Sequence, residues 1–348
     1  MNSESATESR WSRFWFTPVP TTGIHVVRVL SGLLFLFWLL SLVGHQEGFF
    51  SRTGWLDMTA FQELRRQQEF QPADWSILYI AGQNPAIFSA IYWTSIAVIV
   101  LFTLGIATRL TSIGTWVIVV SFLANPATSY DGDYLLGILA FHLMIGHVLM
   151  GAWSGNLNKL EWLLGSRHDF VFARLLFTKP DEPRLSYGAN FMMRLFQIHF
   201  TIIVVTSGLH KLQIGDWWSG SALWYTLHPP FQVTLESLKR ERATAPVVMF
   251  FVSLVQYAAL AWQIGFPAFA WRSGVVWRSV LLGGAAIGWV GVLFLFKLPL
   301  FGPFFFIGSL CFLNADEWAW LKGRVLSMTQ RSAEGKVARE PVKVGSKK

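Results

Sequence analysis

Apolar residues gather in eight runs along the chain, and most of these runs approach the length that a helix needs to cross a bilayer. The runs cover residues 24–43, 86–106, 110–123, 134–153, 191–212, 246–271, 279–296 and 298–313, of which the third and the eighth are short. Strict alternation of polar and apolar residues is absent from them, which argues against a transmembrane barrel, whereas helices satisfy their own backbone groups inside lipid. The pattern therefore predicts an all-α, polytopic transmembrane helical bundle of about eight spans.

Basic residues between the runs predict the orientation of this bundle. With eight spans both termini lie on one side, where the segments outside the spans hold 18 Lys and Arg residues against 7 on the other side. Because cytoplasmic segments carry the excess of basic residues, both termini are predicted to be cytoplasmic. We therefore divide the chain into a cytoplasmic segment 1–21, a membrane domain 22–313 and a basic cytoplasmic tail 314–348 that is partly disordered. The expected location is the cell membrane, as for a multi-pass protein of a bacterial inner membrane.

The composition agrees with a membrane protein, since 53% of the residues are hydrophobic and 16% are aromatic. The net charge of +8 does not indicate a nucleic-acid partner, because eight Lys and Arg residues lie in the polar tail after Leu321, where attraction to a membrane surface accounts for them. Cys311 is the single cysteine, so no intramolecular disulfide is expected, and no group of Cys and His residues has zinc spacing. The predicted partner is the lipid bilayer, and the oligomeric state stays open.

Three long connections link the predicted spans. The first, 44–85, contains residues 61–68, which we expect to form a short amphipathic helix on the outer surface. The second, 154–190, has mixed charge and lies on the cytoplasmic side. The third, 213–245, lies on the outer side and is rich in aromatic residues, among them Trp217, Trp218, Trp224 and Tyr225.

Lys211 stands near the outer end of the fifth span. Ser207 and Gly208 precede it by four and three residues, so they share its helical face and are small enough to admit a neighbouring helix or a ligand. An amine in such a place is partly dehydrated, which favours the neutral form and makes Lys211 a candidate general base. The alternative is an interfacial lysine that snorkels to water beside an aromatic belt of Trp217 and Trp218.

Asp131 and Asp133 lie in another outer connection, which contains no basic residue. They are candidate electrostatic partners of Lys211, or groups that orient a proton acceptor or hold a cation. Asp133 also stands directly before the apolar part of the fourth span and is predicted to cap that helix. The two roles do not exclude each other.

Histidines supply one further candidate, His210, which is next to Lys211 and able to reach the same cavity. His142 and His147 are five residues apart and do not share a face as a metal-binding pair four residues apart does. His199 and His210 share a stripe but lie about 16 Å apart along one helix, so they cannot bind one ion. No metal site is predicted from these residues.

Four stretches of the chain resemble one family of membrane proteins. They are Thr108-Arg109, residues 131–141 (Asp-Gly-Asp-Tyr-Leu-Leu-Gly-Ile-Leu-Ala-Phe), Gly208-Leu209-His210-Lys211-Leu212 and Asp216-Trp217-Trp218-Ser219-Gly220. Together they resemble the HTTM domain, the membrane core that vitamin K-dependent gamma-glutamyl carboxylases share with many bacterial proteins. The resemblance covers roughly residues 22–313.

The resemblance implies a chemical role for Lys211. In the carboxylases the lysine of this motif deprotonates vitamin K hydroquinone, and the oxygenated quinone then removes a proton from a glutamate so that carbon dioxide adds. It thus implies vitamin K hydroquinone or another quinol as cofactor, with oxygen and carbon dioxide. The wall of the quinol pocket is then expected to comprise Trp217, Trp218, Trp224 and Tyr225.

Two features separate the chain from the carboxylases. Gly132 stands where they carry a histidine, and the tail 314–348 replaces their large luminal domain. Carboxylation of a docked protein is therefore not expected, while quinol chemistry at Lys211 is kept as the first hypothesis. The second is a non-enzymatic membrane module, either a partner in toxin maturation or immunity or a small-solute carrier, for which Pro267 within the sixth span is a modest sign of a broken helix.

Overall fold

The computed structural model of the protein describes residues 9–50, 54, 58–67, 75–78, 84–125, 132–150, 185–228, 233–324 and 327. Nearly all regular structure within these residues is helical. The main helices are α2 (Thr22–Leu40), α6 (Pro85–Leu104), α7 (Thr108–Leu123), α8 (Tyr134–Leu149), α11 (Tyr187–Lys211), α15 (Pro246–Ala270), α17 (Gly284–Phe296) and α18 (Phe301–Leu310). Helix α17 continues α16 (Val275–Arg278) through a π-helical turn, η3 (Ser279–Gly283), so the chain is helical from Val275 to Phe296.

Each of the eight apolar runs contains one of these helices, as predicted. Five stretches are long and apolar enough to cross a membrane, namely Thr22–Leu40, Pro85–Leu104, Tyr187–Lys211, Pro246–Ala270 and Val275–Phe296. The other three, α7, α8 and α18, are shorter. The predicted fourth span reaches residue 153, but α8 ends at Leu149 because the backbone of Met150 is extended.

Shorter elements lie between and before these helices. They are α1 (Arg10–Phe16), α3 (Gln46–Phe50), α4 (Met58–Gln67), α12 (Gly215–Ser219), α13 (Ala222–Leu227) and α14 (Leu235–Thr244). Helix α4 confirms the helix expected at residues 61–68. The one departure from an all-α fold among the described residues is the antiparallel pair of β1 (Val19–Pro20) and β2 (Leu185–Ser186). The segments entering α2 and α11 run side by side there and satisfy each other's backbone groups.

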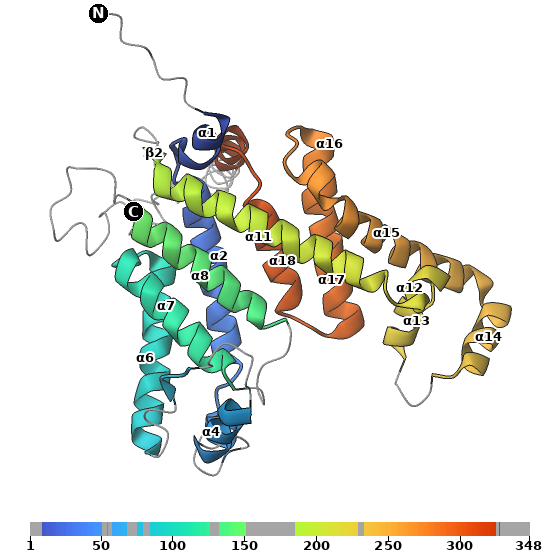
Figure 1. The fold of residues 1–348 in the computed structure, drawn as a ribbon, viewed down its shortest axis with the longest axis horizontal. Helices are drawn as coiled ribbons and strands as arrows, with labels where there is room; N and C mark the ends of the chain where they lie inside the picture. Colours follow the sequence, from blue (N-terminus) through green and yellow to red (C-terminus); the bar gives the residue numbers. More distant parts are fainter. Residues whose placement is uncertain are drawn as a thin grey trace, which may run out of the picture.

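The helices form a bundle with an extension on one side (Figure 1). Helix α2 packs against α6, α8 and α18, and α7 packs against both α6 and α8. Helix α11 packs against α8 and against α15, which links the first half of the chain to the second. In Figure 1, α11 and α15 lead away from the other helices to three short helices, α12, α13 and α14. We call these three short helices the arm.

Small residues allow α8 and α11 to approach closely. A Cβ atom on Gly188 of α11 would lie 2.7 Å from the carbonyl carbon of Leu149, and one on Gly146 of α8 would lie 2.7 Å from Cγ of Met192. Because the start of α11 meets the end of α8, the two helices run antiparallel. Inside a bilayer such close contacts replace the hydrophobic driving force that is absent between helices in lipid.

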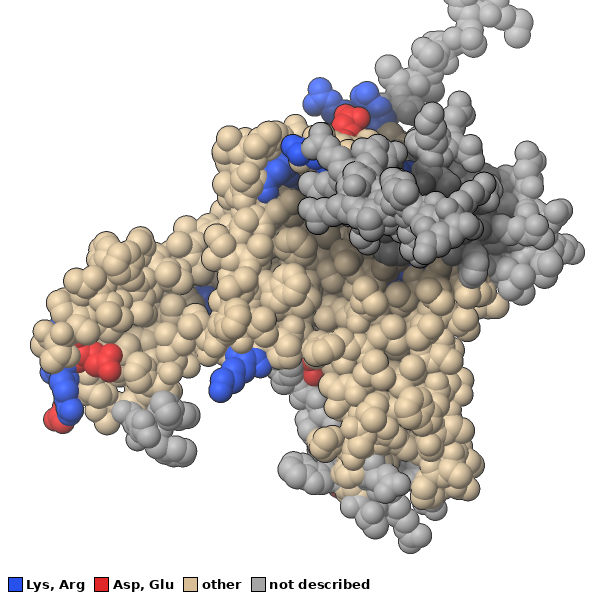
Figure 2. All heavy atoms as spheres, turned by 180° about the vertical axis from the view of Figure 1, so that it is seen from behind, with Lys and Arg blue, Asp and Glu red and all other residues tan. Residues whose placement is uncertain are grey.

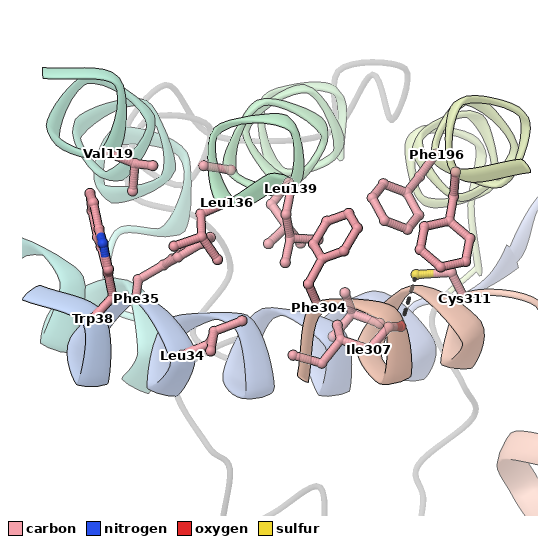
Figure 3. Packing of buried hydrophobic residues seen from close by; sticks show 14 of the residues in the cluster. Leu34, Phe35, Trp38, Val119, Leu136, Leu139, Phe196, Phe304, Ile307 and Cys311 are labelled. Carbon is pink, nitrogen blue, oxygen red and sulfur yellow. Dashed lines mark hydrogen bonds between the residues drawn. The ribbon is translucent and has the colours of Figure 1, made fainter. Parts of the chain in front are cut away.

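The core of the bundle consists of interlocked aliphatic and aromatic side chains (Figure 3). Phe196 of α11 faces Phe304 and Ile307 of α18, while Phe35 of α2 lies near Leu136 of α8. Cys311 is buried and free, and its Sγ donates weakly to the carbonyl of Ile307 at 3.6 Å. The cysteine therefore belongs to the packing of the core.

The outer surface of the bundle is largely uncharged. Figure 2 shows Lys, Arg, Asp and Glu mainly at the margins of the face that it displays. Helix α15 exposes several large apolar side chains, among them Val247, Phe250, Phe251 and Leu254. An apolar face of this kind is what a helix in contact with lipid presents.

The two flanks of the predicted membrane domain also pack on the bundle. Helix α1 lies against α11, where Asn190 Nδ2 donates to the carbonyls of Phe14 and Trp15, each at 3.0 Å. Residues 315–324, at the start of the predicted tail, are helical, and Trp318 packs with Leu310 and Leu313. Residues 10–16 and 315–324 therefore pack as helices on the membrane domain.

Candidate functional site

Lys211 is the last residue of α11 and is half-buried. Its Nζ donates to Ser207 Oγ at 2.8 Å and to the Ser207 carbonyl at 3.3 Å, one turn back on the same helix. The amine also lies 5.5 Å from the centre of the Trp217 ring. The side chain is thus held between its own helix and an aromatic face at the C-terminal end of α11.

Ser207 and Gly208 lie beside Lys211, as their spacing along the helix predicts. Gly208 is buried, and a Cβ atom on it would lie 3.0 Å from Cβ of Gln263 and 3.1 Å from Cγ1 of Ile264. Gly208 therefore admits the neighbouring helix α15, while Ser207 binds the amine. The prediction that this face accommodates a neighbouring helix is confirmed.

The structure places two of the other three site candidates, Asp133 and His210, in different surroundings. Asp133 is buried at the N-cap position of α8, but its side chain makes no capping hydrogen bond, so the predicted cap is wrong. The reason is its backbone, which is α-helical at φ −73° and ψ −29° instead of extended as a capping residue requires. His210 is exposed. Asp131 lies outside the described residues, so its predicted role stays a prediction.

The four aromatic residues fall into two groups. Trp217 lies against Lys211, and Trp218 is exposed, with its Nε1 donating to the Leu212 carbonyl at 2.7 Å. Trp224 and Tyr225 belong to α13, where Trp224 is buried with Leu238 and Met249 in a separate small core. Only the first pair lies beside the lysine end of α11.

Trp224 is anchored by polar contacts within the arm. Its Nε1 donates to Glu241 Oε2 at 2.9 Å, and its ring lies 4.4 Å from that of His228. The Nε2 atom of His228 lies 3.7 Å from Glu241 Oε1. Trp224 thus joins α13 to α14.

A polar stripe on α15 holds the arm and was missed by sequence reasoning. Gln256 is buried, and its Nε2 donates to the carbonyls of Asp216 and Trp217 at 3.2 and 2.8 Å, while its Oε1 accepts from the Leu223 amide at 3.0 Å. Ser253 Oγ donates to the Gly220 carbonyl at 2.8 Å, and Tyr257 Oη donates to the Trp218 carbonyl at 2.7 Å. The signal in the sequence is their spacing of three and four residues, which puts three polar side chains on one face of an apolar helix.

Replacing Gln256 by leucine is expected to loosen the arm. The change leaves two carbonyls and one amide without their partner, at a cost of about 1–3 kcal/mol for a buried polar group that loses its bond. Faster hydrogen exchange at the Leu223 amide is the measurement. The matched control is Gln263→Leu, because Gln263 Oε1 is buried and without a hydrogen-bond partner in the described structure. Unchanged exchange in Gln256→Leu, or equal acceleration in both variants, would contradict the anchoring role.

A cavity of about 660 Å³ lies at the opposite end of α11, where Arg194 and Gln197 line it and Lys211 does not. Arg194 is 17 residues before Lys211, so the two lie roughly 25 Å apart along the helix at 1.5 Å per residue. Among the described residues no cluster of three or more His, Cys, Asp and Glu side chains has the arrangement of a metal site. The lysine end and the cavity are therefore separate places in the fold.

With five helices long and apolar enough to cross a membrane, the chain has the architecture of a multi-pass membrane protein. Neither family models, nor curated proteins, nor solved structures match it.

Proposed function

We propose that the protein crosses the membrane eight times, with both termini in the cytoplasm. A helix in each of the eight apolar runs supports this arrangement, together with 18 Lys and Arg residues on the terminal side against 7 opposite. Helix α18 is shorter than a bilayer, but Phe304, Ile307 and Leu310 are buried among its neighbours. Because protein surrounds it, the non-helical backbone at its ends need not face lipid.

The orientation is tested with cysteines on the two sides. Glu236→Cys in the arm and Arg324→Cys after α18 both replace exposed residues, and the native Cys311 is buried and serves as an unreactive background. A maleimide that does not cross membranes is expected to label Glu236→Cys in intact cells, and Arg324→Cys only after the cells are permeabilised. Labelling of both in intact cells, or the reverse pattern, contradicts the proposed orientation.

For the activity, we propose that Lys211 is the general base for a lipid-soluble quinol, as the resemblance of its stretch implies. The observation that supports this role is the arrangement of the amine. A neutral amine has two N–H groups and one lone pair, and the two contacts to Ser207 use both donors. The lone pair is then left to accept the proton of a quinol hydroxyl, and the Trp217 ring at 5.5 Å stabilises the ammonium that forms.

The proposed cofactor is vitamin K hydroquinone or another quinol, with oxygen as oxidant and carbon dioxide as the further substrate of a carboxylation. His210 and the Asp131–Asp133 connection are the groups proposed to carry the proton onward from Lys211. His210 is exposed, which suits this role. Quinone epoxide formation and oxygen uptake by membranes supplied with reduced vitamin K, compared between the native chain and Lys211→Ala, test the proposal.

A second candidate function is a non-enzymatic membrane module, a partner in toxin maturation or immunity or a small-solute carrier. The observation that favours it is the separation of the 660 Å³ cavity from Lys211, since a binding space at the other end of α11 needs no base. Pro267 lies inside α15, but α15 is continuous from Pro246 to Ala270, so this segment does not show the broken helix of a carrier. Native activity that does not depend on reduced vitamin K supports this candidate over the first.

A further inference from the structure

The cavity at the start of α11 is built from segments that are far apart in the sequence. The first turn of α2, the N-terminal part of α11, the connection between α15 and α16, and one side of the segment 311–323 line it. Asp316 and Glu317 of that segment are not among the lining residues. Its lining includes three basic side chains, Arg194, Arg278 and Lys322, and none of its described lining residues is acidic. Ile24, Met193, Phe312 and Leu313 supply an apolar wall beside them.

Only one of the three basic residues has its charge balanced within the described structure. Arg278 Nε lies 2.7 Å from Glu317 Oε1, and its Nη1 donates to the Ala270 carbonyl at 2.9 Å. Arg194 instead donates from Nη1 to the neutral Gln197 Oε1 at 3.0 Å, and its Nε is buried without a hydrogen-bond partner. Lys322 is half-buried, and no ion pair of the described residues includes it. Two positive charges are therefore left without a counterion at the cavity.

Further residues with unpaired hydrogen-bond donors line the same cavity. Thr22 and Gly23 begin α2, whose N-cap residue Thr21 makes no side-chain cap, so the amides of the first turn have no partner in their own helix. Trp318 is only 8% exposed, and its Nε1 has no hydrogen-bond partner among the residues that the structure describes. This nitrogen lies 2.8 Å from the position that a Cβ atom on Gly23 would take, so the indole N–H sits at the positive end of α2.

We propose that the cavity binds a phosphate-type anion that carries an apolar chain, as an anionic phospholipid does. A helix N-terminus, an indole N–H and an unpaired guanidinium N–H all donate and none accepts, which is the pattern that phosphate oxygens require. The apolar wall then receives the first part of the attached chain. The place of this site at the inner membrane surface rests on the proposed orientation, whereas the binding itself does not.

The experiment uses the full chain purified in an uncharged detergent, with bound molecules counted by native mass spectrometry. The probes are phosphatidylglycerol, phosphatidylcholine and inorganic phosphate, each titrated separately. Phosphatidylglycerol is expected to bind at least about tenfold more tightly than phosphatidylcholine. Arg194→Gln and Lys322→Gln are each expected to weaken its binding about tenfold, as for a lost charge-assisted bond, and Trp318→Phe about threefold.

Matched control residues lie on the helical segment 315–324, which also contains Trp318 and Lys322. Trp320 is 60% exposed and Arg324 is also exposed, so Trp320→Phe and Arg324→Gln make the same chemical changes outside the cavity and are expected to leave binding unchanged. Trp318→Phe and Lys322→Gln keep most of the volume of each side chain. If Arg194→Gln misfolds, these two variants still test whether the cavity binds the anion.

The probes distinguish two sources of the anion. Binding of phosphatidylglycerol alone assigns the site to a lipid headgroup, and binding of inorganic phosphate with the same dependence on Arg194 and Trp318 assigns it to a soluble anion. The first result supports the proposal, and the second contradicts the attached apolar chain. Equal binding of the two lipids, or equal weakening by the cavity variants and the controls, overturns it, and neither result depends on any activity of Lys211.

Discussion

Lys211→Ala is expected to reduce quinone epoxide formation from reduced vitamin K by about 10²–10⁴-fold, the range over which a general base contributes. The variant loses the only group that the proposal assigns to accept the quinol proton, while Ser207 and the close contact at Gly208 stay in place. Epoxide formed per amount of folded protein in isolated membranes is the measurement. Oxygen uptake, followed in parallel, is expected to fall with it.

Two further variants separate a base from other roles of this lysine. Lys239→Ala removes an exposed lysine of the arm and is expected to leave the activity unchanged. Lys211→Arg keeps the positive charge, but a guanidinium stays protonated and cannot accept the quinol proton. This variant is therefore expected to be as inactive as Lys211→Ala. An active Lys211→Arg variant would show that charge, not base strength, matters. A native chain that forms no epoxide from reduced vitamin K would falsify the vitamin K proposal.

Phe200→Ala is expected to be the most destabilising single substitution in the core, at about 3–5 kcal/mol of unfolding free energy. Phe200 of α11 is 0% exposed, and its ring lies 5.6–6.2 Å from five other aromatic rings. These rings come from Phe196, Phe266, Phe304, Phe305 and Phe312. Because α11, α15 and α18 meet at this side chain, its removal leaves a cavity that three helices cannot close together.

The midpoint of unfolding by sodium dodecyl sulfate measures this effect on the protein in mixed micelles. The control is Phe250→Ala on α15, where the side chain is 63% exposed on the face that we assign to lipid. Its removal is expected to change the midpoint little, since it forfeits contacts with lipid or detergent and few with protein. A control that loses as much stability as Phe200→Ala would place Phe250 in a protein interface instead of lipid.

The helices were predictable because their cause is local. Inside lipid an apolar run of sufficient length has to satisfy its backbone within itself, so hydropathy alone placed one helix in each of the eight runs. The same local reasoning located α4 and the small residues that let α15 approach Lys211. The end of α8 and the missing cap at Asp133 were not predictable, because they depend on the backbone angles of Met150 and Asp133, which hydropathy does not specify.

The candidate site was only partly predictable. Ser207 and Trp217 contact Lys211. Ser207 is predicted from its spacing of four residues, and Trp217 from its place in an aromatic loop beside the lysine. Trp224 has the same local signal as Trp217, yet a hydrogen bond to Glu241 of α14 holds it in a separate small core with Leu238 and Met249. Aromatic residues in one loop look alike in the sequence, and their partners on other helices separate them.

The sequence by itself determined that the chain is helical and apolar enough for a membrane, where its helices lie, and that Lys211 closes one of them, since hydropathy and helical spacing act over neighbouring residues. Only the tertiary structure decided that Gln256 holds the arm and that Trp318, from the predicted tail, stands over the first turn of α2. Contacts of this kind join residues from distant parts of the chain. They arise from how whole helices pack, which no local pattern encodes.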